Sequence, residues 1–163
     1  MNFDRNSLLL MDDSTLCSIC KITFSKGSGP GGQKRNKTSS LATVELPELG
    51  VSAGDCTERS QFRNRSNALK KLRMMLALNF RESELKIPEN MACSMNSPAY
   101  PLFAAQLLDI MQSNDWDYRK SAVFCGISPT AMLKKFYRDP ELWQFLQKKR
   151  QESSLPPLLA PGH

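Results

Sequence analysis

The sequence has few of the features that mark a membrane or secreted protein. No stretch of its 163 residues is long and apolar enough to cross a bilayer, and its first residues lack the basic start and the cleavage site of a signal peptide. The cysteines number five, and because only Cys17 and Cys20 lie close together they do not suggest a disulfide framework. We therefore expect a cytoplasmic protein with no membrane partner, and an organelle matrix stays open as an alternative.

Side chains that commonly bind metals or transfer protons are also scarce. The one histidine is the last residue, His163. Cys17 and Cys20 have the spacing of half a zinc site, but the other three cysteines are single and scattered along the chain. We expect ordinary buried or free thiols, no metal site and no cofactor.

Acidic residues are absent from two windows, 21–44 and 59–81, which hold five and seven cations. Twelve of the 22 Lys and Arg residues thus lie in the windows, which leaves ten cations against 16 acids and a net charge of −6 elsewhere. A surface made only for solubility mixes its signs, so these windows favour a polyanionic partner. A generic basic face is the alternative.

The first window contains the stretch GSGPGGQKRNKT at residues 27–38. Its glycines match the spacing of a dinucleotide-binding loop, but that loop must open a helix, whereas residues 34–40 are polar and lead into an alternating, strand-like segment. A P-loop requires lysine directly after the last glycine, where Gln33 stands. A hairpin needs only two turn residues, so we predict a long functional loop between two strands.

Periodicity predicts a small α+β domain around this loop. Alternating segments indicate strands at 20–24, 42–46 and 51–56, and the last two form a hairpin through the turn at 47–50. From the candidate N-cap Ser60, apolar residues recur every three or four positions among arginines and lysines. We predict a three-stranded mixed or antiparallel sheet, the long loop, and one basic helix of roughly twenty residues.

The rest of the chain has a helical pattern, with helices expected over 102–111, 116–124, 130–137 and 141–150. Segment 121–133 is similar to a helix–turn–helix, since Gly126 stands at the turn and Ser128 precedes a first-turn proline. The cations that would then contact phosphate are Lys134, Lys135 and Arg138. A small helical bundle that packs against the first domain or another protein is the alternative, with Trp116, Trp143 and Phe145 in its core.

These patterns divide the chain into five parts. They are an N-terminal extension (1–13), the α+β domain (14–88), a linker (89–98), a helical C-terminal module (99–150) and a proline-rich, disordered tail (151–163).

Two segments together resemble the catalytic domain of class I peptide chain release factors, and especially their shortened relatives that rescue stalled ribosomes. The first is SGPGGQ at 28–33 with NKT at 36–38, and the second is ERSQ at 58–61, followed by Asn64 and a basic helix. The resemblance covers residues 18–85, about half of the chain. It implies hydrolysis of the ester between a nascent peptide and its tRNA in the peptidyl-transferase centre of the ribosome.

The resemblance also implies roles for the Gly-Gly-Gln triplet as catalytic residues. Gly31 and Gly32 would shape the turn that presents Gln33, whose backbone N–H would stabilise developing charge as an oxyanion-hole donor does. The Gln33 side chain would admit water and exclude larger nucleophiles. Little acid–base work would fall to the protein, which agrees with the lack of a usable histidine. A glutamine methyltransferase acting on Gln33 is a further implied partner.

The implied main partners are ribosomal RNA and peptidyl-tRNA. The expected phosphate contacts around the loop are Lys26, Lys34, Arg35 and Lys37, and those along the helix are Arg59, Arg63, Arg65, Lys70, Lys71 and Arg73. Asn36 and Gln61 are expected to bond sugar or base edges.

The chain departs from the family in three respects. Lys34 stands where a histidine often follows the glutamine, and a helical module with Lys148–Arg150 stands where rescue hydrolases carry a basic tail. Because about twenty residues precede the first strand, we expect no codon-reading region. Codon-independent release by a monomer is therefore the preferred hypothesis. A noncatalytic, ribosome-associated RNA-binding factor and a helix–turn–helix DNA-binding regulator remain as alternatives.

Overall fold

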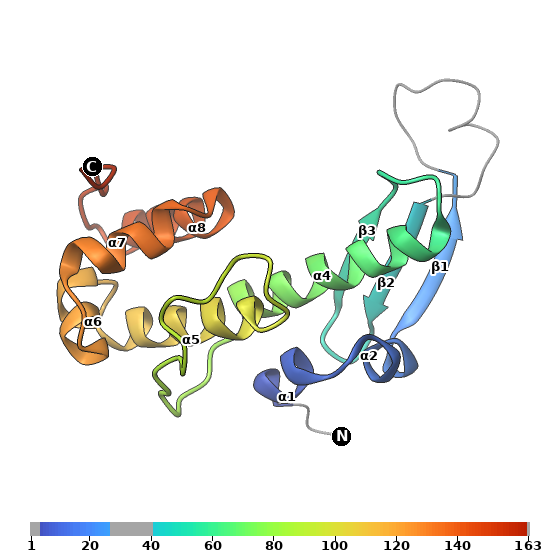
Figure 1. Ribbon diagram of the computed structural model, residues 1–163, viewed down its shortest axis with the longest axis horizontal. Coiled ribbons are helices and arrows are strands. Elements are labelled where there is room, and N and C mark those ends of the chain that lie inside the picture. The colour runs from blue at the N-terminus through green and yellow to red at the C-terminus, as the bar shows by residue number, and fades with distance from the viewer. Residues whose placement is uncertain (1–3, 27–40, 163) are drawn as a thin grey trace. The chain divides into compact units, whose positions relative to one another are not determined.

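The computed structural model describes residues 4–26 and 41–162, and the chain divides into two compact units, Met1–Leu76 and Ala77–His163 (Figure 1). The elements that begin in the first unit are α1 (Arg5–Leu10), α2 (Asp13–Ile19), β1 (Lys21–Ser25), β2 (Leu41–Leu46), β3 (Val51–Asp55) and α4 (Gln61–Asn79). Those of the second unit are α5 (Tyr100–Ser113), α6 (Tyr118–Cys125), α7 (Pro129–Tyr137) and α8 (Pro140–Glu152). The α+β prediction with a helical C-terminal part is confirmed. No helix of the described segments is long and apolar enough to span a bilayer.

The sheet is antiparallel with β2 in the centre. In β2 the residues Ala42, Val44 and Leu46 are fully buried, and the residues between them are half-buried, as the alternation predicted. The turn between β2 and β3 ends at Gly50, whose φ of +64° disfavours any residue with a Cβ. The sheet therefore has one covered apolar face, formed mainly by its central strand.

Helix α4 supplies the rest of the first core. Its buried residues include Leu69, Leu72 and Leu76, which follow the predicted spacing. Ser60 caps the helix by accepting from Arg63 N at 3.3 Å, as predicted. In the first turns of the helix, the fully buried Asn64 amide accepts from Glu58 N and donates to Glu58 O, both at 2.9 Å. These paired bonds fix the turn by which the chain enters α4.

Two short helices precede the sheet, in a part of the sequence whose pattern did not reveal them. Asp12 caps α2 by accepting from Thr15 N at 2.7 Å, and Leu16 is fully buried. Arg73 of α4 is 8% exposed, and its guanidinium bonds Asp13 Oδ1 at 2.7 Å and Met11 O at 2.9 Å. Arg73 thus fastens both short helices to α4.

In the second unit α7 begins at the side-chain cap that the sequence indicated, whereas α5 has no side-chain cap. Ser128 caps α7 ahead of Pro129, and Gly126 ends α6 in the left-handed conformation with a φ of +69°. Helix α6 starts later than expected because Asp115 and Trp116 have positive φ and Asp117 is the cap. Trp116 is buried, whereas Trp143 and Phe145 are half-buried.

Asp139 joins the start of α5 to the start of α8. Its carboxylate accepts from Glu141 N and Leu142 N, which caps α8, and from the Tyr100 hydroxyl at 2.7 Å. Burial raises the pKa of Tyr100, and the bond to the carboxylate raises it further. The Arg138 guanidinium lies over the Tyr100 ring, 5.6 Å from its centroid.

After α8 the chain folds back along this helix without regular structure. Leu158 N donates to the Gln147 side chain at 2.9 Å, and Gln147 donates to Leu158 O at 2.8 Å. Arg150 is 7% exposed and donates to Trp116 O and Pro156 O. Burial lowers the pKa of Arg150. This cation of the Lys148–Arg150 cluster is therefore part of the fold.

The carboxylate of Asp55 gives the first unit a dependence on pH. Desolvation alone would raise its pKa, but donors from Lys71, Thr57 and Asn67 outweigh that effect and hold the pKa at about 2, below the usual 3.8. The unfolded chain therefore takes up the proton first, so the stabilisation is complete above about pH 4 and disappears as the pH falls towards 2.

We expect Asp55→Asn to lower the free energy of unfolding by on the order of 2 kcal/mol at neutral pH, and this difference to shrink between about pH 4 and pH 2. Urea unfolding followed by far-ultraviolet circular dichroism measures it. Glu48→Gln, an exposed acid in the turn, is the matched control. A deficit of Asp55→Asn that stays constant across this pH range would contradict the assignment.

We expect Tyr100→Phe to destabilise the second unit by about 2 kcal/mol, because a buried hydrogen bond to a carboxylate is lost. Both tryptophans lie in this unit, so their fluorescence during urea unfolding reports on it selectively. The control Tyr137→Phe alters a hydroxyl on a residue that is 48% exposed, and its midpoint should match the wild type. Equal midpoints for both variants would show that the Tyr100 bond contributes nothing.

Candidate nucleic-acid interface

The strands on either side of the glycine-rich stretch meet at one end of the sheet. Ser25, the last residue of β1, is the register partner of Leu41, the first residue of β2. The predicted residues between the strands lie outside the described segments. They are Gly31, Gly32, Gln33, Lys34, Arg35, Asn36 and Lys37.

The beginning of α4 lies at this same end of the sheet (Figure 1). Lys26, directly after β1, and Arg59, two residues before α4, are both exposed. Gln61 and Arg63 are exposed in the first turn of the helix. Arg63 lies 3.8 Å from Glu58, and because both side chains are largely exposed this ion pair holds the guanidinium only weakly. The structure thus brings the described part of the first cationic window to the start of the second.

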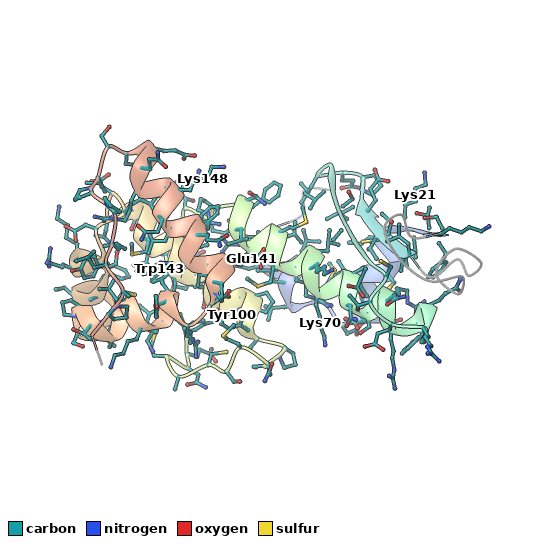
Figure 2. The ribbon with its side chains drawn as sticks, turned by 90° about the horizontal axis from the view of Figure 1, so that it is seen from above. Lys21, Lys70, Tyr100, Glu141, Trp143 and Lys148 are labelled. Carbon is teal, nitrogen blue, oxygen red and sulfur yellow. The ribbon has the colours of Figure 1, made fainter. Side chains whose placement is uncertain are left out.

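The predicted cations of α4 divide into two groups. Lys70, labelled in Figure 2, projects from the helix into solvent. Lys71 instead bonds Asp55 Oδ1 at 2.8 Å and Gly54 O at 3.2 Å, and Arg73 is buried against α2. The side chains of Lys71 and Arg73 therefore have partners inside the unit, while Arg63 and Lys70 present their charge outwards.

Phe62 is a member of this surface that the sequence pattern did not single out. Its side chain is 67% exposed, and the Arg65 guanidinium lies over its ring, 5.1 Å from the centroid. The sequence does contain a clue, because an aromatic residue with an arginine three positions later places both on one helix face. Flat aromatic and guanidinium surfaces are the groups on which RNA bases stack.

Two cysteines lie at the C-terminal end of α2. Cys17 and Cys20 are free and half-buried, and burial, with Cys17 close by, raises the pKa of Cys20. Within residues 4–26 and 41–162, no group of three or more His, Cys, Asp or Glu side chains is placed to hold a metal ion.

Most of the cations in the helix–turn–helix-like segment donate hydrogen bonds to main-chain carbonyls. Lys135 donates to Met91 O and Arg138 donates to Cys93 O, so both fasten the irregular segment before α5. Burial lowers the pKa of Lys135. Lys134 is exposed. Of the three expected phosphate contacts here, two already bond main-chain carbonyls.

Comparison with known proteins assigns a family to the domain that contains this end of the sheet. Residues 17–97 match the family model of the RF-1 domain. Peptide chain release factor 2 of Lactiplantibacillus plantarum is 40% identical over 72 residues, which are 44% of this chain and 19% of that relative. The chain thus aligns with about a fifth of the relative's length, and no solved structure matches it. Residues 17–97 of this chain are therefore an RF-1 domain, the Gly-Gly-Gln domain of the class I release factors.

Proposed function

We propose that this chain acts in translation termination as a release-factor-like hydrolase, which cleaves peptidyl-tRNA on stalled ribosomes without reading a codon. The observation that carries the proposal is the RF-1 domain itself, with Gly31, Gly32 and Gln33 in the segment between two strands that meet at Ser25 and Leu41. Hydrolysis of the ester adds water to the carbonyl carbon, breaks its bond to the tRNA oxygen and leaves a proton on the tRNA hydroxyl.

The protein's share of this chemistry is positioning and charge stabilisation. The backbone N–H of Gln33 would donate to the oxyanion that forms when water adds to the carbonyl. Glycine at 31 and 32 would let the chain approach the reacting ester in a crowded RNA pocket, where a Cβ would collide. Such a mechanism needs no histidine or metal among the side chains around it.

The exposed cations at the same end of the sheet would hold the domain on RNA. Lys26, Arg59, Arg63 and Lys70 are exposed and lie in windows that contain no acid, so they suit a phosphate-rich partner. The ribosome, through its RNA and the peptidyl-tRNA, is the partner we propose. We further propose a cytoplasmic monomer whose Gln33 is a substrate for a glutamine methyltransferase.

Codon independence is the finer part of the proposal. The alignment with release factor 2 covers 19% of that relative, so recognition of a stop codon is not transferred to this chain. A noncatalytic ribosome-associated factor would have no use for the Gly-Gly-Gln triplet. A DNA-binding regulator is disfavoured because Lys135 and Arg138 donate to carbonyls of their own unit.

The decisive measurement is release of labelled peptide from ribosomes that carry peptidyl-tRNA and an mRNA truncated at the P-site codon. We expect the wild type to release peptide there, and no faster when a stop codon is present. Gly32→Ala should lower the rate about 10²–10³-fold, because it displaces the Gln33 donor. Gly162→Ala, where an added Cβ meets no atom within 4 Å, is the matched control.

Ribosome binding of the same variants separates the alternatives. Gly32→Ala should bind ribosomes as the wild type does, since no charge is lost. If the wild type binds ribosomes yet releases no more peptide than Gly32→Ala, the noncatalytic factor replaces the hydrolase. If release occurs only with a stop codon, codon independence is wrong.

We expect Arg63→Gln and Lys70→Gln each to weaken ribosome binding and to reduce the salt dependence of that binding by nearly one contact, roughly 0.7–0.9 in the log–log slope. Lys134→Gln removes an exposed cation from α7 and should leave both quantities unchanged. Sedimentation with ribosomes over a salt series measures the slopes. A larger effect of Lys134→Gln would assign the polyanion surface to the helical unit instead.

A further inference from the structure

A concave site lies between α2 and α4 in the first unit, on the α4 face that carries Phe62. Its volume is about 340 Å³, within the roughly 300–1,000 Å³ of typical small-ligand sites. Phe62 and Arg65 line it together with Leu69, which is 1% exposed, and Cys17, which is half-buried. We call this site the stacking pocket.

The ring of Phe62 is poorly explained as part of the core. It is 67% exposed, whereas the apolar residues that follow it on α4, such as Leu69 and Leu72, are at most 1% exposed. A single exposed phenylalanine needs no special reason. Here, however, it borders a hollow, and the Arg65 guanidinium lies 5.1 Å from its centroid. Two flat groups with π or delocalised surfaces thus adjoin one cavity.

The pocket also has polar groups along its border. Ser14 of α2 and Ser66 of α4 line it with hydroxyls that can both donate and accept. Asp13 lines it as well, and its charge is compensated by Arg73 at 2.7 Å. The exposed cations Arg63 and Lys70 lie on the same helix. A flat ligand with polar edges that is attached to phosphates fits all of these groups.

We propose that the stacking pocket binds one unpaired base of an RNA strand. The base stacks on the exposed part of the Phe62 ring, beside the Arg65 guanidinium, its edge meets the hydroxyls of Ser14 and Ser66, and Arg63 and Lys70 hold neighbouring phosphates. The inference rests on the proposed function, because it takes RNA as the partner of this surface, and it adds a base-binding site outside the Gly-Gly-Gln loop. A paired base cannot enter, since its faces are already stacked.

The test measures binding of the full-length chain to a short single-stranded RNA that contains 2-aminopurine, whose fluorescence falls when it stacks. Phe62→Leu keeps an apolar side chain but removes the ring. We expect it to weaken binding about 5- to 150-fold, to abolish the quenching and to leave the salt slope unchanged. Phe62→Tyr should retain wild-type behaviour. Arg65→Lys keeps the charge and the slope but loses part of the affinity, because lysine has no flat surface.

Two controls make the outcome specific. Phe124→Leu removes a ring that is 44% exposed on α6 and should change nothing. An RNA duplex of the same length should bind wild type and Phe62→Leu equally. Urea midpoints should also agree, since Phe62 is mostly exposed. The inference is overturned if the wild type quenches no 2-aminopurine, if Phe62→Leu binds the single strand as tightly as the wild type, or if Phe62→Leu and Phe124→Leu lose affinity equally.

The assay is independent of peptide release. A chain that stacks bases through Phe62 but releases no peptide from stalled ribosomes would refute the proposed function and leave this site standing. A chain that releases peptide while Phe62→Leu binds RNA normally would refute the site alone.

Discussion

The first unit depends on the hydrogen bonds that the buried carboxylate of Asp55 accepts. Asp55 is the last residue of β3, and its carboxylate accepts from Thr57 in the following turn and from Asn67 and Lys71 of α4. One side chain therefore joins the sheet, the connection and the helix. Because it fixes the N-terminal half of α4, it also fixes the rotation of that helix, and hence which of its side chains face the sheet, α2 or solvent.

That rotation explains why a run of cations that looks uniform in the sequence is divided in the structure. Lys71 faces β3 and Arg73 faces α2, where each has an acidic partner. Arg63 and Lys70 lie on the outward face. A buried arginine that lost its partner would cost several kcal/mol, so Arg73 serves the fold. Charge counting alone cannot make this division, because it depends on acids that are distant in sequence, such as Asp13.

The sequence predicted the regular elements well where several turns or alternations could be counted. The three strands, α4 and the caps at Ser60 and Ser128 appear as expected, within a residue or two at their ends. Helices α1 and α2 were missed because six or seven residues give too few turns for periodicity to emerge. Phe62 was missed because apolar spacing assigns a helical phenylalanine to the core, and only the structure shows its exposure.

In the second unit several basic residues stabilise the fold by donating hydrogen bonds to main-chain carbonyls. Lys135, Arg138 and Arg150 each donate to main-chain carbonyls, and burial lowers the pKa of Lys135 and Arg150. An arginine that donates to carbonyl oxygens satisfies backbone groups that have no partner in a helix or strand. Arg138 does this at Cys93 and Arg150 at Pro156, and both hold irregular segments in place. In the RF-1 domain, by contrast, the exposed cations Lys26, Arg59, Arg63 and Lys70 lie in windows that contain no acidic residue, which favours attraction of a polyanion there.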